Sequence, residues 1–409
     1  MQTINSNSAV ASGWACTTAP EWIATLLRTK NDMTASAPTT GIPAAKKPRS
    51  SNLELYRIIC MLMIVAHHYV VNSGLMEEGA PLLGHPDTWH TIFLWLFGMW
   101  GKTGINCFLM ITGYFMCKSQ ITVKKYLKLL LQIYLYNWVI FIIFFLTGHQ
   151  QLTTHSALQL ILPFWGFTNN FTSCFIIFYL IIPFLTILVQ HLSQRQHLLL
   201  VLVATGCYTL FGSIPSFEVT FNYITWFSII YFIASYIRLY PAPIFERRSL
   251  WGWLTLLSVI GAMLSVVILQ HSTFMVYQYV DDSNKLFALL VAFCSFIWFK
   301  NINIKQSAFI NAVGSTCFGV LLIHANSDAM RVWLWNDTVD CIGSYAMPMQ
   351  QLVPYCIGVV IAIFAVCSLI DYLRIQCLEK PFFKWYDKRL DSRVNHFVNT
   401  KILGISDND

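Results

Sequence analysis

Long apolar segments recur along most of the chain and limit its possible folds more than any other feature. A helix needs about 20 mostly apolar residues to cross the hydrocarbon core of a bilayer. Ten segments meet or approach this length: 54–73, 91–116, 126–147, 173–190, 198–214, 222–240, 250–270, 286–300, 308–328 and 353–375. Only 11% of the residues are charged, against about 25% in soluble domains. The sequence therefore predicts an all-α polytopic membrane protein with about ten transmembrane helices.

The second of these segments is longer than a single crossing requires and is interrupted. Its middle carries the run GKTG, residues Gly101 to Gly104. Glycine lowers helix stability relative to most other residues. We therefore expect either a broken helix here, or a re-entrant piece followed by a helix.

Basic residues are distributed asymmetrically between alternate loops. The stretches 74–90, 148–172, 213–221 and 271–284 contain no Lys or Arg, and 329–351 contains only Arg331. Cytoplasmic loops of membrane proteins are enriched in Lys and Arg. These stretches are therefore predicted to face outward, with both termini in the cytoplasm. The net charge of +7 is explained by this topology, so nucleic-acid binding is not predicted.

Composition divides the chain into three regions. Residues 1–51 are rich in Ser, Thr, Ala and Pro and end in a basic run, which predicts a disordered cytoplasmic tail and not a signal peptide. Residues 52–383 hold all ten apolar segments. Residues 384–409 form a short basic tail on the cytoplasmic side.

Arg57 and His68 lie inside the first apolar segment. Ionisable side chains are costly in hydrocarbon, so they usually face a protein interior or a wet cavity and take part in chemistry or transport. The two residues are eleven positions apart, so they share a helix face about 16 Å apart along the axis. Arg57 would lie near the cytoplasmic end and His68 in the outer half. Their placement suggests a path that links a cytoplasmic ligand to the outer face.

Neighbouring residues leave two interpretations open. Glu54 is three residues before Arg57 and can pair with it on the helix surface. The pair is either a simple interfacial ion pair or a device that orients Arg57 toward a phosphate or carboxylate. His67 points about 100° away from His68, so it either faces the same cavity or packs elsewhere in the bundle.

Further candidates lie near both faces of the membrane. Lys124, Lys125 and Lys128 are either positive-inside anchors or a patch that binds the phosphates of a nucleotide-like donor. Trp165 and Asn169 are expected at the outer mouth of the fourth segment, where tryptophan either belongs to the interfacial belt or stacks on a sugar. His324 ends the ninth segment and either reaches a central cavity or caps a helix end.

Several chemistries are not indicated. The nucleophile elbow GxSxG, the P-loop, the dinucleotide motif GxGxxG and the HExxH helix are all missing from the sequence. No CxxC pair occurs among the 12 cysteines, so no metal site is expected. These observations argue against a hydrolase, an ATPase, a Rossmann oxidoreductase and a zincin.

Four motifs, in order, resemble those of the membrane-bound acyltransferase-3 family, which includes bacterial O-acetyltransferases of surface polysaccharides. The first is the acidic residue, Arg and His of the first segment, here Glu54, Arg57 and His68. The others are GINCFLMITGYF (Gly104 to Phe115), STCFGVLLIH (Ser315 to His324) and the ending EKPF (Glu379 to Phe382). The chain departs from the family pattern at Leu109, Thr112 and Leu321, and carries lysines where the family often has arginines.

The resemblance implies a function. It implies an O-acyltransferase of the bacterial cytoplasmic membrane that moves an acyl group, acetyl in the first instance, from cytoplasmic acyl-CoA to a hydroxyl of a glycan or lipid-linked sugar. An imidazole titrates at about pH 6.5, so His68 is predicted to act as the general base or as a transient acyl carrier. Arg57, with Glu54, is expected to bind or polarise the donor. The three lysines are expected to hold donor phosphates, and His67, Trp165, Asn169 and His324 to receive the acceptor. No tightly bound cofactor is expected.

Two alternatives involve no acyl chemistry. A transporter or flippase would use the Arg57 and His68 pathway for permeation, and would move its substrate without releasing CoA. A sensory or structural membrane protein would need Arg57 and His68 only for stability.

Overall fold

The computed structural model describes residues 50–397, except 120, 165–169, 218 and 273–274. Of the three regions expected from composition, the N-terminal tail up to residue 49 lies outside the described residues. The basic tail is helical as far as Phe397. The chain divides into a unit up to Pro48 and a unit from Arg49 onward, and only the second is considered below.

The described residues form helices joined by short connections, without a strand. The first half contains α2 Ser51–Val71, α3 Pro81–Gly84, α4 Trp89–Gly98, α5 Gly101–Met116, α6 Val123–Leu146, α7 Thr154–Ile161, α8 Phe171–His191, α9 Gln194–Thr205, η2 Gly206–Leu210 and η3 Phe211–Ser213. The second half contains α10 Tyr223–Leu239, η4 Pro243–Glu246, α11 Arg248–Ile268, α12 Leu286–Lys300, α13 Ala308–Gly314, α14 Cys317–His324, α15 Asp328–Val332, η5 Trp333–Thr338, α16 Cys341–Ser344, α17 Met349–Arg374, η6 Ile375–Glu379, α18 Lys380–Arg389 and α19 Asp391–Phe397.

The predicted class, an all-α polytopic membrane protein, is confirmed. Among the described residues, seven helices are long and apolar enough to cross a membrane, and the bent pair Ala308–His324 and Asp328–Ser344 is an eighth candidate. Helices α10 and α12 coincide with the two remaining predicted segments, but they are shorter than the others. The full count of ten crossings and the cytoplasmic position of both termini stay predictions.

The outward faces of the longest helices are apolar. Exposed aliphatic and aromatic side chains cover them, for example Ile142 and Ile143 on α6, Phe184 and Ile187 on α8, Leu257 and Leu264 on α11, and Ile361 and Leu369 on α17. Water-facing surfaces seldom carry apolar patches of this extent. These faces are therefore suited to contact with lipid.

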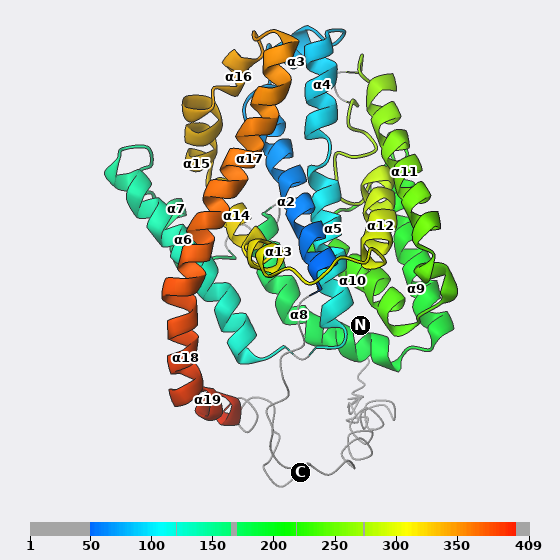
Figure 1. Cartoon of the computed structure of the whole chain (residues 1–409), viewed down its shortest axis with the longest axis vertical. Coiled ribbons are helices and arrows are strands. Elements are labelled where there is room, and N and C mark those ends of the chain that lie inside the picture. Colours follow the sequence, from blue (N-terminus) through cyan, green and yellow to red (C-terminus); the bar gives the residue numbers. More distant parts are fainter. Residues whose placement is uncertain (1–49, 120, 165–169, 218, 273–274, 398–409) are drawn as a thin grey trace, which may run out of the picture. The chain divides into compact units, whose positions relative to one another are not determined.

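Helix α2 lies at the centre of the unit from Arg49 onward. It contacts α4, α5, α12, α13, α14 and α17 (Figure 1). Most of its aliphatic and aromatic side chains are buried, including Tyr56, Val65 and Tyr69. The helix that carries Arg57 and His68 is therefore held by neighbours from both halves of the chain.

Three glycines allow α4 and α5 to approach α2 closely. A Cβ atom at Gly98 would lie 2.6 Å from Val70 Cβ, one at Gly101 would lie 2.2 Å from His67 Cγ, and one at Gly104 would lie 2.9 Å from the Cys60 carbonyl oxygen. Small residues at helix contacts are typical of membrane bundles, where close backbone approach improves packing. The predicted interruption of this segment is a turn at Met99 and Trp100, directly before GKTG. Both residues keep right-handed helical dihedrals, and α4 and α5 together form one candidate span, Trp89–Met116.

Substitution of Gly104 tests this contact. Gly104→Ala should destabilise the folded protein by about 1–3 kcal/mol, because the added methyl group must push the α2 backbone away. Gly358→Ala is the matched control, since a Cβ at this helical position meets nothing within 4 Å. The measurement is thermal unfolding in detergent. Equal unfolding temperatures for the two variants would contradict the packing described here.

Candidate active site

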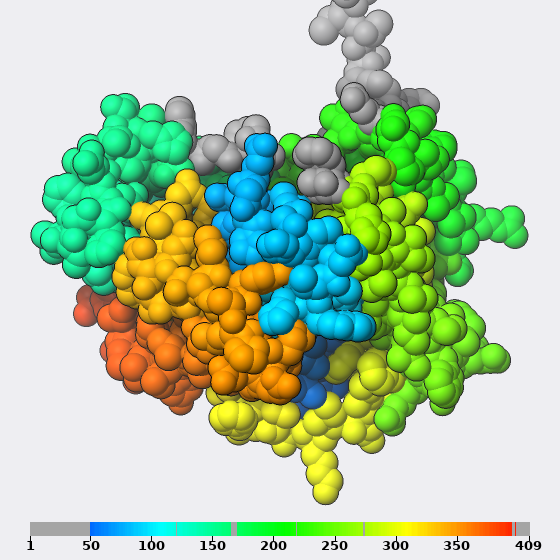
Figure 2. All heavy atoms as spheres, turned by 90° about the horizontal axis from the view of Figure 1, so that it is seen from above, coloured from blue at the N-terminus to red at the C-terminus, as the bar shows by residue number. Residues whose placement is uncertain are grey.

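A large cavity with a mixed polar and apolar lining lies at the end of the bundle where α2 and α14 finish. Its volume is about 880 Å³. Its polar lining comprises Asn72, Lys102, Asn137, His149, Gln150, Gln151, Thr153, His155, Ser156, Gln159, Asn170, Thr172, Ser173, Tyr223, Asn326, Ser327, Asp328 and Arg331, together with His67 and His68. Much of this lining comes from segments 148–172 and 325–331, which lie on or next to the stretches poor in Lys and Arg. Figure 2 shows this end of the molecule.

His68 lines the cavity and is joined to His324, which ends α14 and lies behind His68, outside the cavity lining. The Nδ1 atom of His68 lies 2.9 Å from Nε2 of His324, a residue 256 positions later in the chain. His324 is only 1% exposed, and its Nδ1 lies 2.6 Å from the Val320 carbonyl oxygen. The indole of Trp335 contacts the His324 ring edge-on. The structure thus brings together two predicted site residues that lie far apart in the sequence.

His67 lines the same cavity but is held differently. Its Nδ1 lies 2.6 Å from the Gly98 carbonyl oxygen, and its ring packs over Gly101. The two histidines therefore point to different neighbours, as their adjacent positions on a helix require. His67 thus combines the two interpretations that the sequence left open, since it packs against α4 and α5 and also faces the cavity.

Arg57 is paired with Glu54 and lies outside the cavity lining. The Nη1 atom of Arg57 is 2.9 Å from Oε1 of Glu54, whose side chain is 7% exposed. Gly314 lies against this carboxylate, because a Cβ at that position would lie 2.5 Å from Oε2. The ion pair is therefore covered by α13 on one side, which limits the directions in which Arg57 can turn.

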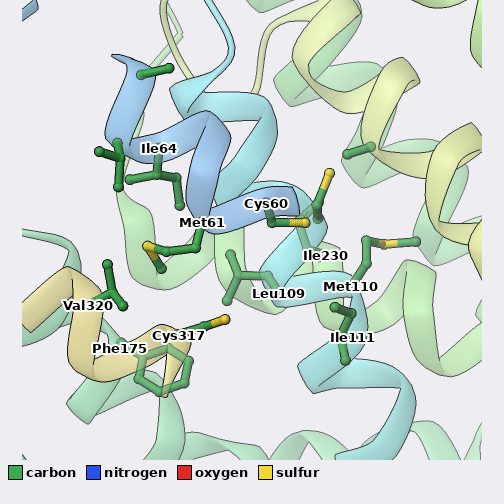
Figure 3. Close-up of a cluster of buried hydrophobic side chains, with 14 of the residues drawn as sticks. Cys60, Met61, Ile64, Leu109, Met110, Ile111, Phe175, Ile230, Cys317 and Val320 are labelled. Atoms are coloured by element: carbon green, nitrogen blue, oxygen red, sulfur yellow. The ribbon is translucent and has the colours of Figure 1, made fainter. Parts of the chain in front are cut away.

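An apolar layer separates Arg57 from the cavity. It consists of Cys60, Met61 and Ile64 on α2 and Cys317 and Val320 on α14 (Figure 3). Met61 and Ile64 also form part of the cavity wall. In this structure the path expected between Arg57 and His68 is therefore filled with side chains.

The three predicted donor-binding lysines lie at the start of α6, and two of them are in ion pairs. Lys124 Nζ is 2.5 Å from Asp387 Oδ1, and Lys128 Nζ is 2.5 Å from Glu379 Oε1. Lys125 donates a hydrogen bond to Ser119 over 2.6 Å. The acidic partners come from the C-terminal helical segment, so a donor phosphate would have to compete with these carboxylates.

Two predicted residues are outside the described part of the chain. Trp165 and Asn169 both fall in the range 165–169. The described residues that flank this range on the two sides include Pro163 and Asn170, and both line the cavity.

A buried charge network was missed by the sequence reasoning. Asp371 Oδ1 accepts hydrogen bonds from Tyr136 over 2.7 Å, from Gln132 over 3.2 Å and from Arg374 over 2.7 Å. Arg374 also donates to Glu379 over 2.7 Å. Gln132 and Tyr136 continue the four-residue spacing that begins with Lys124 and Lys128, so one face of α6 is polar along several turns. That spacing was the signal available in the sequence.

This network also holds α14 in place. A Cβ at Gly319 would lie 2.1 Å from Cγ of Asp371, so the carboxylate packs directly on the helix that ends at His324. Asp371 is fully buried. The position of His324 therefore depends on a contact made five residues earlier on α14.

Lys102 is a second residue that the sequence reasoning did not single out. Its Nζ donates to the Tyr223 hydroxyl over 2.7 Å and lies 3.4 Å from Asp282. Both Lys102 and Tyr223 line the cavity. The sequence did carry a signal for Lys102, because it is a charged residue inside an apolar segment, in the run GKTG.

Comparison with known proteins adds one finding. The model of the acyltransferase-3 family, described as an acyltransferase domain, matches residues 50–372. The match contains α2 with both of its ionisable residues, the cavity lining and α14. No curated protein and no solved structure matches the chain significantly.

The buried network can be tested against an exposed ion pair. Asp371→Asn should destabilise the folded protein by about 3 kcal/mol, because it leaves buried Arg374 without one of its two carboxylates. Asp387→Asn is the control, and it should cost less than about 1 kcal/mol because its pair with Lys124 is 49% and 37% exposed. Unfolding in detergent measures both. A larger effect for Asp387→Asn would be inconsistent with this assignment.

Proposed function

Because the chain belongs to the acyltransferase-3 family and is a membrane acyltransferase, we propose that it moves an acetyl group from cytoplasmic acetyl-CoA to a hydroxyl of a cell-surface glycan or lipid-linked sugar. The proposed location is the bacterial cytoplasmic membrane. The observation that carries the proposal is the hydrogen-bond contact of His68 with buried His324, because His68 lines a cavity rich in amides and hydroxyls. The proposal predicts that the acceptor enters from the outer face.

The cavity suits a carbohydrate. Amide and hydroxyl side chains can both donate and accept hydrogen bonds, as sugar hydroxyls do. Phe108, Phe141, Phe171 and Phe318 add apolar surface to the same lining. A few placed polar groups among apolar walls are typical of small-molecule sites. This mixture favours a hydroxyl-rich acceptor group over a lipid chain.

In the proposed reaction, His68 accepts the proton of the acceptor hydroxyl. The freed oxygen attacks the thioester carbonyl carbon, and the bond from carbon to sulfur breaks. The proton then passes from His68 to the departing thiolate, so the products are the ester and CoA with a free thiol. General-base catalysis of this kind contributes about 10²- to 10⁴-fold to rate.

We propose that the donor binds at the ends of α2 and α6 that lie away from the cavity. Lys125 lies 12 residues before Asn137 on α6, and Asn137 lines the cavity, so the distance along the helix is about 18 Å. A donor whose phosphates bind near the lysines would extend along this direction toward His68. The apolar layer lies across this route, so we propose that α2 and α14 separate locally when the donor binds.

Replacement of His68 tests the base assignment. His68→Ala should abolish transfer without loss of the folded protein, although buried His324 loses its partner and the unfolding temperature falls somewhat. The measurements are CoA thiol release by the purified protein, and alkali-labile acetyl esters on surface glycan from a deletion strain complemented with each variant. His271→Ala, at an exposed outer position, is the control.

Each outcome has a separate meaning. Retained transfer by His68→Ala would overturn the role of His68. If deletion of the gene leaves acetylation unchanged and the wild type releases no CoA, the donor or the acceptor is wrong.

Replacement of Arg57 tests the donor assignment. Arg57→Lys should lower transfer by about tenfold or more, because an ammonium cannot reproduce the planar, two-pronged hydrogen bonding of a guanidinium. It should also reduce the rise in unfolding temperature that acetyl-CoA produces. Arg248→Lys, at an exposed position, is the control. Wild-type behaviour of Arg57→Lys would limit Arg57 to an electrostatic role.

A further inference from the structure

The hydrogen bonds of His324 determine where the protons of the histidine pair lie. A carbonyl oxygen can only accept, so the His324 Nδ1 atom, 2.6 Å from the Val320 oxygen, carries a hydrogen. In a neutral imidazole the other nitrogen is then an acceptor. The Nε2 atom of neutral His324 therefore presents a lone pair to His68.

The same reasoning applies to His68. Its Nδ1 atom lies 2.9 Å from this lone pair and must be the donor of the hydrogen bond. The Nε2 atom of neutral His68 is then unprotonated. This nitrogen is the atom that a general base requires, and His68 lines the cavity.

A charged His324 would reverse this arrangement. It would donate from both nitrogens, His68 Nδ1 would accept, and His68 Nε2 would carry the hydrogen instead. His324 is 1% exposed, and its described hydrogen-bond partners are the Val320 carbonyl and His68, neither of which is a carboxylate. An unpaired charge in such a position is costly, so the neutral arrangement is favoured.

We propose that His324 is a positioning residue that holds His68 in the tautomer with a free Nε2 atom and stabilises its charged form during transfer. The inference rests on the proposed function, because it gives His324 a role in supporting His68, the base of the proposed reaction. When His68 Nε2 takes the acceptor proton, the ring becomes positive and its Nδ1 hydrogen bond to His324 becomes charge-assisted. Such bonds are shorter and about twice as strong as neutral ones. The interaction is therefore stronger in the transition state than in the ground state, which is the condition for a faster chemical step.

The surroundings of His324 fit this role. Its backbone is fixed by the packing of Asp371 on Gly319, and its ring is in edge contact with Trp335. The ring is held by Trp335 and by the bond of its Nδ1 atom to the Val320 oxygen, so it loses little freedom when its Nε2 atom accepts a hydrogen bond. Pre-organised support of this kind is what keeps a catalytic group in one orientation.

Three variants test the proposal. His324→Phe keeps a ring of similar size and removes the acceptor, and it should lower kcat about 10- to 100-fold with little change in KM. His324→Gln supplies an amide oxygen at similar reach, and it should recover part of this loss. His197→Phe is the matched control, because His197 is also fully buried and bonded to a carbonyl oxygen, that of Phe232, but has no described hydrogen bond to a residue of the cavity lining.

A second measurement does not depend on transfer. Diethyl pyrocarbonate acylates unprotonated imidazole nitrogens, and peptide mass spectrometry reports the rate at His68. His324→Phe should slow this modification several-fold, because free imidazole favours the tautomer with hydrogen on Nε2, whereas His197→Phe should leave the rate unchanged. Unfolding temperatures are measured for all variants.

The outcomes separate the inference from the function on which it rests. Wild-type kcat and wild-type modification rate in His324→Phe would overturn the positioning role. Equal loss in His324→Phe and His324→Gln, with equally lowered unfolding temperatures, would make His324 structural only. A slower modification in His324→Phe together with a wild type that transfers no acetyl group would support the positioning role and refute the proposed acetyl transfer.

Discussion

The cost of placing polar groups in hydrocarbon governs this structure. A charged or hydrogen-bonding side chain in a membrane-spanning helix has no water to contact and must find a partner inside the protein. Arg57 forms an ion pair with Glu54 on the same helix. Asp371 accepts hydrogen bonds from Tyr136 and Gln132 on α6 and from Arg374 on its own helix. His68 finds its partner on a third element, α14. The polar pairs therefore act as the specific contacts in an otherwise apolar bundle, and they determine which helices can be neighbours.

Close backbone approach is the second condition for these pairs. Gly98, Gly101 and Gly104 bring α4 and α5 against α2, while Gly314 and Gly319 bring α13 and α14 against Glu54 and Asp371. A larger residue at any of these positions would force its neighbours to shift, because its Cβ would lie only 2.1 to 2.9 Å from them. The glycines in the family-like motifs are thus explained by packing, and the catalytic candidates depend on them indirectly.

The arrangement divides the molecule into two polar regions with an apolar layer between them. The cavity lined by His68 lies on one side, and the pair of Glu54 and Arg57 lies on the other. Figure 3 draws the apolar side chains of the layer. A permanent polar passage would let water and ions cross, and the apolar layer closes that passage in this structure. The layer consists of two cysteines, a methionine, an isoleucine and a valine, and the small cysteines and the flexible methionine can move without a large cost.

The sequence by itself determined the membrane class, the positions of the apolar segments, the family resemblance and the presence of Arg57 and His68 on one helix. These features depend on hydropathy, charge asymmetry and helical periodicity, which are local properties of a chain. The tertiary structure decided that His68 pairs with His324 and that Arg57 is separated from the cavity. It also decided that two of the three lysines form ion pairs with acidic residues and that Asp371 packs on α14. Each of these involves residues far apart in the chain or on different helices. Their contact depends on how whole helices pack, and no local pattern in one sequence records that packing.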